Sequence, residues 1–252
     1  VSLLEGATLW NNTVLGGFLK TNIDFPILKD VVNWFKETLK SMISPKSDLF
    51  SLVFKELESG EIRTSDILLL LKKADSMIDK IICKKEGTIF ASNLKFTNEI
   101  EFVHKTNEST NTLNYNQESL GTQRFYQLSG VLDMLLRKEC IFAIDELENS
   151  LHPDLLEYFL RVYLANSKTS QLVATTHFRE LLIDKDMLRN DAIWFTEKKK
   201  DGSTDLFSLT DFDSSVIRDT SSVYNAYKIG KLGAVPNLGD YYINLEDDEK
   251  DK

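Results

Sequence analysis

Apolar residues recur at helical spacing in the first third of the chain. Over residues 26–43 they return every three or four positions, which predicts one long helix with a proline in its first turn. The same spacing predicts a helix over 48–59 that stops at a glycine, and another over 65–81 with Ser65 as its N-cap. We therefore expect residues 1–87 to form a helical arm lobe.

Beyond residue 87 the pattern changes to alternation of apolar and polar positions. Short runs rich in β-forming residues predict antiparallel strands at 88–91, 95–97 and 99–104. The tract 105–117 is rich in Asn and Thr and predicts a loop, with room for one strand near 113–115. Residues 88–117 are thus expected to form short antiparallel strands and a polar loop.

From residue 118 onward, helical and strand patterns alternate. A helix over 122–138 precedes an apolar strand at 140–144, and a second helix, which begins at Pro153, precedes a strand at 172–175. This order is typical of βαβ units, in which helices flank a parallel sheet. We therefore predict the α/β fold class, with 118–245 as its principal domain.

Two features close the sequence. Residues 193–197 and 205–209 are strand-like and are joined through Asp201 and Gly202, which predicts a hairpin. Charged residues dominate 246–252, which predicts a solvated acidic tail.

Composition narrows the classes of function. The 252 residues carry a formal net charge of -9 and a pI near 5.0. Phosphate backbones are held by clustered Lys and Arg, so this balance argues against a broad nucleic-acid surface. Cys83 and Cys140 lie in apolar segments and form no ligand-spaced pair, so we expect neither a disulfide nor a zinc site. A reducing cytoplasm suits such a protein.

No membrane span or secretory signal is indicated. The longest apolar runs, 67–71 and 141–144, are far shorter than the roughly 20 residues that cross a bilayer. The sequence starts at Val1, without Met and close to an apolar stretch. We therefore expect that residues upstream are missing or belong to another chain.

Two adjacent carboxylates follow the strand predicted at 140–144. Asp145 can reach a magnesium ion at the carboxyl edge of a parallel sheet, and Glu146 can reach a water molecule that must lose its proton as it attacks a phosphate. The alternative is a strand that ends in an ordinary polar turn. Short motifs often arise by chance, so the pair alone leaves both interpretations open.

A second motif, Glu118-Ser119-Leu120-Gly121-Thr122, precedes the helix predicted at 122–138. A Ser hydroxyl, a Gly and unsatisfied amides at a helix N-terminus form an anion site that suits a terminal phosphate. The alternative is a Ser cap with Gly in a turn. Its place shortly before the strand carboxylates favours the anion site.

A third motif, Ala174-Thr175-Thr176-His177, ends the next predicted strand. Neighbouring parallel strands end at the same edge of a sheet, so His177 and the two carboxylates can converge on one crevice. A lone His is otherwise most often an ordinary surface or core residue. Between the two strands, Asn149 and Ser150 belong either to a helix cap or to a loop that reaches across a dimer interface.

In this order the motifs closely resemble the ABC-type ATPases of the SMC and OLD group. ESLGT is similar to a degenerate ABC signature, IFAIDE to the Walker B strand, NSLHP to the D-loop and TTH to the switch-histidine loop. Longer strings resemble the prokaryotic anti-phage defence ATPases, including Septu PtuA-like and restriction-linked members: ESLGTQRFYQL, IDELENSLHPDLL, TTHFRELL, IWFTEKKKDG and GKLGAVP. The resemblance covers nearly all of 118–236, and the helical lobe resembles the arm insertion of that family more loosely.

The resemblance implies ATP and Mg²⁺ as cofactors and a role for each matching residue at the strand ends. Asp145 supports magnesium, Glu146 activates water and His177 senses the terminal phosphate. The parallel sheet and its flanking helices then form part of an ABC-type ATPase domain.

The resemblance also implies a homodimer assembled through its ATP sites. Ser119 and Gly121 contact the ATP of the opposing protomer, and Asn149 and Ser150 lie at the dimer seam. By the same resemblance, we expect the ATPase to gate an effector, such as an HNH nuclease or another toxin, in anti-phage defence.

The sequence departs from the family at the phosphate-binding loop. No G-x-x-x-x-G-K-S/T run occurs, and Gly230-Lys231-Leu232 lacks both the first Gly and the hydroxyl residue. That loop cradles the α and β phosphates. No Q-loop is identified either, and in this family both lie upstream of the helical arm. We therefore expect this chain to be the C-terminal part of the ATPase and to be inactive alone.

Three interpretations stay open. In the first, the chain is part of an ATPase whose N-terminal half is a separate chain, a cleavage product or an unassigned segment, which the intact Glu146 favours. In the second, it is a catalytically incomplete scaffold that lends Ser119 to a partner's ATP or holds an effector. The third is a metallohydrolase with five candidate ligands: Asp145, Glu146, Glu148, His152 and His177. It is the weaker alternative because Glu148 and His152 straddle a predicted loop with Pro153, which does not assure a helical i,i+4 geometry.

Overall fold

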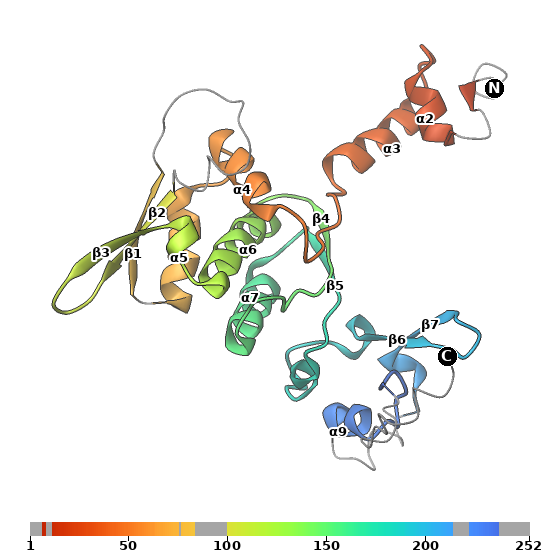
Figure 1. Ribbon diagram of the computed structural model, residues 1–252. Helices are drawn as coiled ribbons and strands as arrows, with labels where there is room; N and C mark the ends of the chain where they lie inside the picture. The colour runs from red at the N-terminus through yellow and green to blue at the C-terminus, as the bar shows by residue number, and fades with distance from the viewer. Residues whose placement is uncertain (1–6, 9–11, 76, 84–99, 214–221, 237–252) are drawn as a thin grey trace, which may run out of the picture. The chain divides into compact units, whose positions relative to one another are not determined.

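The computed structural model of the protein describes residues 7–8, 12–75, 77–83, 100–213 and 222–236 (Figure 1). The chain divides into two units, Val1–His177 and Phe178–Lys252. The first unit contains a parallel strand pair with flanking helices and a small antiparallel sheet. The fold class is therefore α/β, as predicted.

Helix α6 (Leu120–Arg137) is the buried centre of the first unit. It is buried almost throughout from Arg124 to Leu135, because other helices contact it on several sides. Those neighbours are α4 (Leu49–Glu58), α5 (Thr64–Ala74) and α7 (Pro153–Asn166) (Figure 1). The predicted α4 and α7 are confirmed, including the proline in the first turn of α7. None of the described helices has the length and apolar character needed to cross a bilayer.

The parallel sheet places the predicted motifs. Strands β4 (Ile141–Ile144) and β5 (Gln171–Ala174) run parallel, with Ile144 opposite Ala174. The opposite edge of β4 is occupied by an extended segment, where Lys40 N donates to Ile141 O at 3.0 Å and Asp145 N donates to Ile43 O at 2.7 Å. Strand β4 is therefore central, whereas β5 has no strand on its second edge within the described part of this unit.

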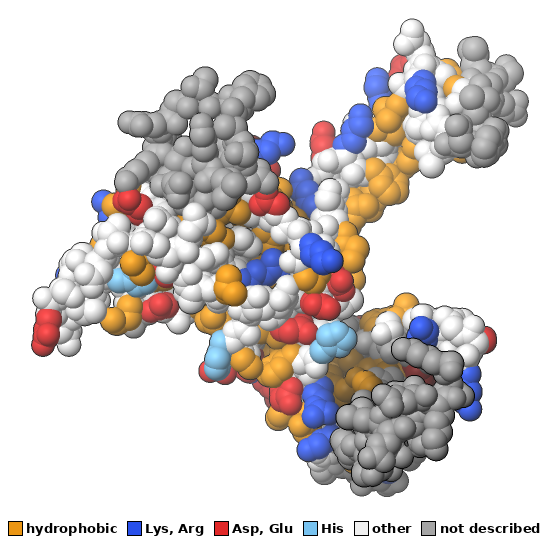
Figure 2. All heavy atoms as spheres, viewed as in Figure 1, with side chains coloured by type: hydrophobic (Ala, Val, Ile, Leu, Met, Phe, Trp, Pro, Cys, Tyr) orange, Lys and Arg blue, Asp and Glu red, His pale blue; other side chains and the backbone are white. Residues whose placement is uncertain are grey.

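That extended segment corrects the helix predicted over 26–43. Helix α3 (Pro26–Glu37) ends earlier, because the following residues pair with β4 instead of continuing the helix. Preceding it is α2 (Val14–Leu19), which is capped by Thr13. The apolar face of α3 is exposed and appears as a stripe along the helix in Figure 2; it includes Ile27, Val31, Trp34 and Phe35.

The antiparallel sheet has the order β1 (Ile78–Cys83), β2 (Ile100–Lys105) and β3 (Thr110–Asn114). The strand expected at 99–104 is confirmed, and β3 lies near the expected one. A short 3₁₀ turn, η2 (Tyr115–Gln117), connects β3 to α6. The strands predicted at 88–91 and 95–97 lie outside the described residues.

The helix predicted over 65–81 is wrong at both ends. It begins at Thr64, so Ser65 lies inside it and is not the cap. It ends at Ala74 because Asp75 is extended and its side chain accepts a hydrogen bond from Met77 N at 2.9 Å. Ile78 and Ile81 are buried, but they lie on strand β1.

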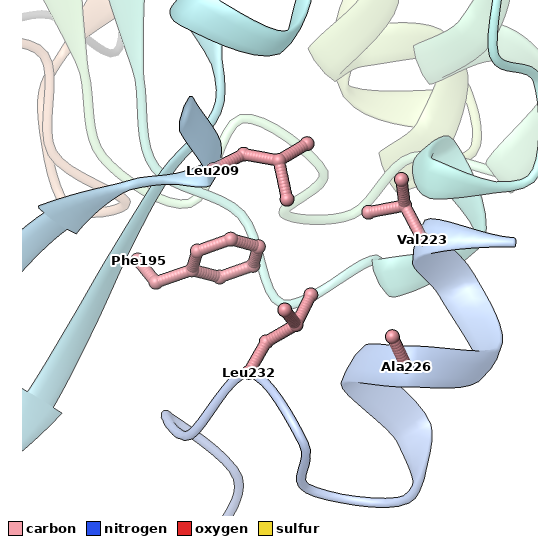
Figure 3. Packing of buried hydrophobic residues seen from close by; sticks show 5 residues of the cluster. All are labelled: Phe195, Leu209, Val223, Ala226 and Leu232. Atoms are coloured by element: carbon pink, nitrogen blue, oxygen red, sulfur yellow. The ribbon is translucent and has the colours of Figure 1, made fainter. Parts of the chain in front are cut away.

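The second unit is built on the predicted hairpin. Strands β6 (Trp194–Lys198) and β7 (Thr204–Ser208) pair antiparallel. Helix α9 (Val223–Lys228) and the 3₁₀ turns η3 (Arg179–Leu182), η4 (Asn190–Ala192) and η5 (Leu209–Asp211) complete it. Its core is a small cluster, shown in Figure 3: Phe195, Leu209, Val223, Ala226 and Leu232. The acidic tail at 246–252 lies outside the described residues.

The close approach of α4 to α6 requires Gly130. A Cβ atom there would lie 2.6 Å from both Cγ atoms of Val53, which is fully buried. Helix propensity favours Ala over Gly by roughly 0.5–1 kcal/mol, but overpacking of a core costs about 1–3 kcal/mol. We expect Gly130→Ala to lower the free energy of unfolding by about 1–2 kcal/mol, measured by urea denaturation.

The matched control is Val53→Ala, which opens the space that the new methyl group needs. In that background Gly130→Ala should be neutral or stabilising, because the propensity gain remains and the clash is removed. Equal destabilisation in both backgrounds contradicts the steric explanation.

Candidate functional site

The ends of β4 and β5 are joined by the side chain of Thr175. Its hydroxyl donates to Asp145 Oδ1 at 2.6 Å and accepts a hydrogen bond from Glu146 N at 2.9 Å. Leu147 N donates to the Thr175 carbonyl oxygen at 3.0 Å. The register of the two parallel strands produces this arrangement, since Ile144 and Ala174 are opposite each other. The two strand ends therefore meet through Thr175, whereas the convergence of His177 with Asp145 and Glu146 on one crevice stays a prediction.

Glu146 has an unusual backbone conformation. Its φ is 49°, in the left-handed region, and Ser150 in the same loop has a φ of 61°. A non-glycine residue there costs about 1–2 kcal/mol, and such strain clusters at functional sites. The loop retains its shape through local bonds, in which Asn149 N donates to Glu146 O at 2.9 Å and Leu151 N donates to Glu148 O at 2.8 Å.

Glu148 connects this loop to the segment after β5. Its Oε1 accepts a hydrogen bond from His177 N at 2.7 Å. Its Oε2 is buried and has no hydrogen-bond partner within the described residues. The His177 backbone is therefore fixed to the loop, while its imidazole is exposed.

The predicted signature turn lies against the same loop. Ser119 is the N-cap of α6, and its hydroxyl accepts a hydrogen bond from Thr122 N at 3.1 Å. A Cβ at Gly121 would be in contact with the Ser150 carbonyl oxygen at 3.5 Å, so the turn and the loop touch. The structure thus brings Gly121 of the signature turn to Ser150 of the loop. It also shows that Ser119 is an ordinary helix cap, as the alternative interpretation requires.

A cleft of about 400 Å³ opens beside this contact. The N-terminal turns of α6 and α7 border it, with Ser119 and Thr122 from the first and His152 from the second. The positive dipole ends of the two helices favour an anion here. The amides of Thr122 and Asp154 are already hydrogen-bonded, however, and the carboxylates of Asp75 and Asp154 line the same cleft.

The residues present suit a magnesium nucleotide. Asp145 Oδ2 does not take part in the Thr175 bond and is a hard oxygen ligand of the kind that Mg²⁺ prefers. The exposed Ser119 hydroxyl at the start of α6 suits a phosphate oxygen.

The metallohydrolase alternative gains no support. Among the described residues, no three His, Cys, Asp or Glu side chains are placed to share a metal ion. His152 instead caps α7, where its Nδ1 accepts a hydrogen bond from Asp154 N at 3.3 Å.

The sequence motifs indicate no role at the ATP site for Thr175 or Glu148. Thr175 lies within the third motif, and its position directly after a strand could have indicated a functional role. Glu148 was considered only as a metal ligand, and no sequence pattern indicates its bond to the backbone of His177.

Solved structures similar to this chain come from SMC ATPases. One is entitled "Structural biochemistry of ATP-driven dimerization and DNA stimulated activation of SMC ATPases", with a TM-score of 0.43, 15% identity and coverage of 74% of this chain and 99% of that chain. The SMC head domain from Thermotoga maritima has a TM-score of 0.45 and 14% identity, with coverage of 72% of this chain and 60% of that chain. The SmcHead bound to the C-winged helix domain of ScpA has a TM-score of 0.42 and 16% identity, with 61% and 45% covered.

No curated protein matches the sequence. The family described as "AAA domain, putative AbiEii toxin, Type IV TA system" matches residues 38–184. This span begins beside the extended segment that pairs with β4 and includes α6, β4, α7 and β5. Because the match covers more than half of the sequence and all three motifs, the chain belongs to this family of AAA ATPase domains.

Proposed function

We propose that this chain supplies the signature, Walker B, D-loop and switch-histidine parts of an ATP site that hydrolyses ATP at a dimer interface. The observation that carries the proposal is the Thr175 bridge, which holds the Asp145 carboxylate and the Glu146 backbone at one point of the sheet edge. An ordinary polar turn after a strand does not need this bridge or the strained φ of Glu146.

Each residue at the strand ends then has a defined task. Asp145 would hold the metal of a magnesium nucleotide, and that ion would supply electrostatic stabilisation of the terminal phosphate. Glu146 holds the attacking water and accepts its proton. His177 places its exposed imidazole near the same edge, where it reports on the terminal phosphate.

The other half of the site faces a partner. Ser119 and Gly121 offer the N-terminus of α6 to the ATP of the opposing protomer, and Asn149 and Ser150 lie at the seam of a homodimer. The contact between Gly121 and Ser150 supports this pairing, because it makes one surface from the two motifs.

The phosphate-binding loop comes from outside these 252 residues, on a separate chain or another part of the same protein. Strand β5 supports this. Parallel strands normally have neighbours and helices around them, yet Val173 on β5 is 61% exposed and the strand has a free edge within the described part of the unit. A further parallel strand on that edge completes the sheet.

The ATP cycle gates an effector, such as a toxin or nuclease, in anti-phage defence. The protein acts in a reducing cytoplasm. The support for such an effector is the description of the family as a "putative AbiEii toxin, Type IV TA system", which associates such AAA domains with toxin systems. The acidic chain itself offers no broad nucleic-acid surface.

A scaffold role is the second candidate. The observation that favours it is the Ser119 cap, because a helix cap needs no nucleotide. In that case the chain holds an effector or a partner ATPase, and Glu146 has no catalytic task.

A substitution of Glu146 distinguishes the catalytic role from the scaffold role. The amide of Glu146→Gln keeps the volume of the side chain but cannot accept the proton of water. In the ATP-binding assembly we expect Glu146→Gln to retain nucleotide and to slow hydrolysis by roughly 100-fold or more, so that the closed dimer accumulates. Asp145→Asn should instead weaken magnesium-dependent binding, because it changes a metal ligand.

Turnover and nucleotide binding are measured side by side for the two variants. Normal turnover by the Glu146→Gln protein contradicts the catalytic role and favours the scaffold. Loss of nucleotide binding in that variant contradicts the division of roles between the two carboxylates.

The Thr175 bridge has a test of its own. Thr175→Val keeps the shape but removes the hydroxyl that Asp145 and Glu146 N share, whereas Thr175→Ser keeps it. We expect Thr175→Val to reduce turnover about 10-fold to 100-fold, the scale on which loss of a ligand-orienting partner acts, and Thr175→Ser to stay near the original rate. Equal turnover of both variants contradicts a role of the Thr175 hydroxyl in hydrolysis.

The isolated chain provides a final test. Without a cradle for the α and β phosphates, it should show no measurable heat of ATP binding in calorimetry at micromolar concentrations of protein. Micromolar affinity of the chain alone contradicts the proposal that the phosphate-binding loop comes from elsewhere.

A further inference from the structure

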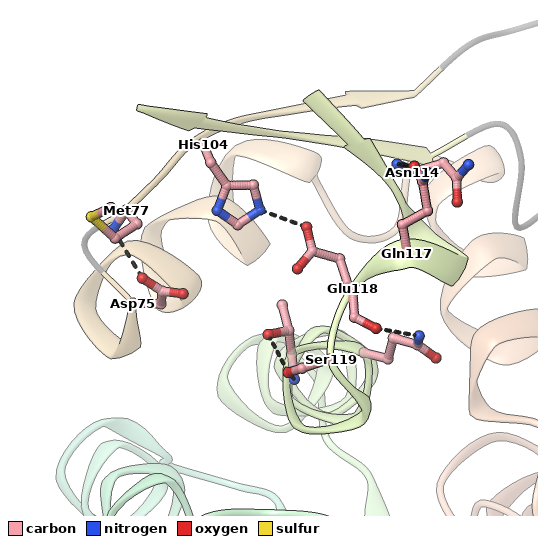
Figure 4. Close-up of polar contacts among 9 residues, drawn as sticks. Asp75, Met77, His104, Asn114, Gln117, Glu118 and Ser119 are labelled. Atoms are coloured by element: carbon pink, nitrogen blue, oxygen red, sulfur yellow. Dashed lines mark hydrogen bonds and ion pairs between the residues drawn. The ribbon is translucent and has the colours of Figure 1, made fainter. Parts of the chain in front are cut away.

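Glu118, the residue before Ser119, has a buried carboxylate, and its side-chain partner among the described residues is His104. The side chain of Glu118 is 5% exposed, and its Oε1 lies 2.5 Å from Nε2 of His104 (Figure 4). A carboxylate can only accept, so the imidazole nitrogen carries the hydrogen of this bond. Burial of such a group without a donor is costly. The His104 bond therefore decides where Glu118 can lie.

His104 lies on the central strand of the antiparallel sheet. On β2 it is opposite Ile78 of β1 and Asn111 of β3, so ladder bonds on both sides restrain its backbone. Its side chain is directed at Glu118, as Figure 4 shows. Through His104, the three-stranded sheet thereby contacts the residue directly before the N-cap, close to a register shift between Ile78 and Lys80 of β1.

The turn that leads into α6 is fixed at further points. Gln123 Nε2 donates to the Glu118 carbonyl oxygen at 2.8 Å, and Asn114 N donates to Gln117 Oε1 at 2.9 Å just before it (Figure 4). These bonds are local in sequence. Within the part of the chain that the structure describes, the His104 bond alone connects the Glu118 side chain to another element.

We infer that His104 is a positioning residue for Ser119 and that it acts through Glu118. Movement of the antiparallel sheet is thereby coupled to the signature turn. A displacement of β2 moves His104, and the carboxylate follows because it has no comparable donor within the described residues. Since Glu118 and Ser119 are neighbours, the hydroxyl changes its direction at the start of α6. The importance of that direction for ATP rests on the proposed function; the coupling itself does not.

The coupling is tested on the 252-residue chain by hydrogen exchange of individual amides, read by NMR. Thr122 N–H, which Ser119 caps, reports the turn directly. We expect His104→Ala to raise exchange at Thr122 about 10-fold, the scale of one hydrogen bond to a charged group. His104→Gln, which retains a donor, should restore most of the protection. Amides of α7 and β6 should not change.

Two controls separate coupling from general loosening. Thr112→Ala removes an exposed side chain from β3 and should leave Thr122 unaffected. In a Glu118→Ala background, His104→Ala should add nothing further, because its route to the turn is already removed. Unchanged exchange in His104→Ala, or additive effects of the two substitutions, overturns the inference.

A second measurement separates this inference from the proposed function. In the ATP-binding assembly, His104→Ala should raise the ATP concentration for half-maximal association about 10-fold and leave turnover at saturation nearly unchanged, with recovery in His104→Gln. If exchange at Thr122 rises but association does not change, His104 still positions Ser119, and the role of Ser119 in ATP binding is wrong. If neither changes, the coupling is wrong.

Discussion

The burial of α6 on several sides is the constraint on which the first unit depends. Its neighbours are placed by specific contacts along its length: Gly130 admits Val53 of α4, Phe125 packs 6.0 Å from the ring of Tyr158 in α7, and Arg137 binds Asp66 of α5 at 2.7 Å. Such a helix cannot shift without disturbing all three. Any force applied at its N-terminal turn is therefore transmitted to the core.

Several polar groups of this helix are buried, and their burial costs free energy of folding. Desolvation lowers the pKa of Arg124, and it raises the pKa of Asp133 in spite of the bond from Arg137. Arg124 Nε and Nη2 are buried without hydrogen-bond partners among the described residues. Burial of these groups opposes folding, so apolar contacts such as those of Leu128 and Leu132 must outweigh it.

Local patterns predicted the elements, and long-range pairing decided the exceptions. The run that ends at Ile43 has helical spacing, but Leu39 and Ile43 pair with β4, a contact that no local signal contains. Ile78 and Ile81 also fit a helix, and the Asp75 turn places them in a strand. The strand-end motifs were predictable because parallel strands end together. The bonds of Thr175, Glu148 and His104 depend on side-chain geometry between segments distant in sequence, which spacing does not encode.

Strand β5 has one unpaired edge among the described residues of its unit, which has a consequence for how the protein is produced. Unpaired strand edges bind other strands with little selectivity, so a chain made alone presents a template for aggregation. Val173 adds an exposed apolar side chain to this strand. Chaperones and proteases recognise such surfaces. If the further strand proposed above covers β5, the yield and solubility of the chain should rise when the two are made together.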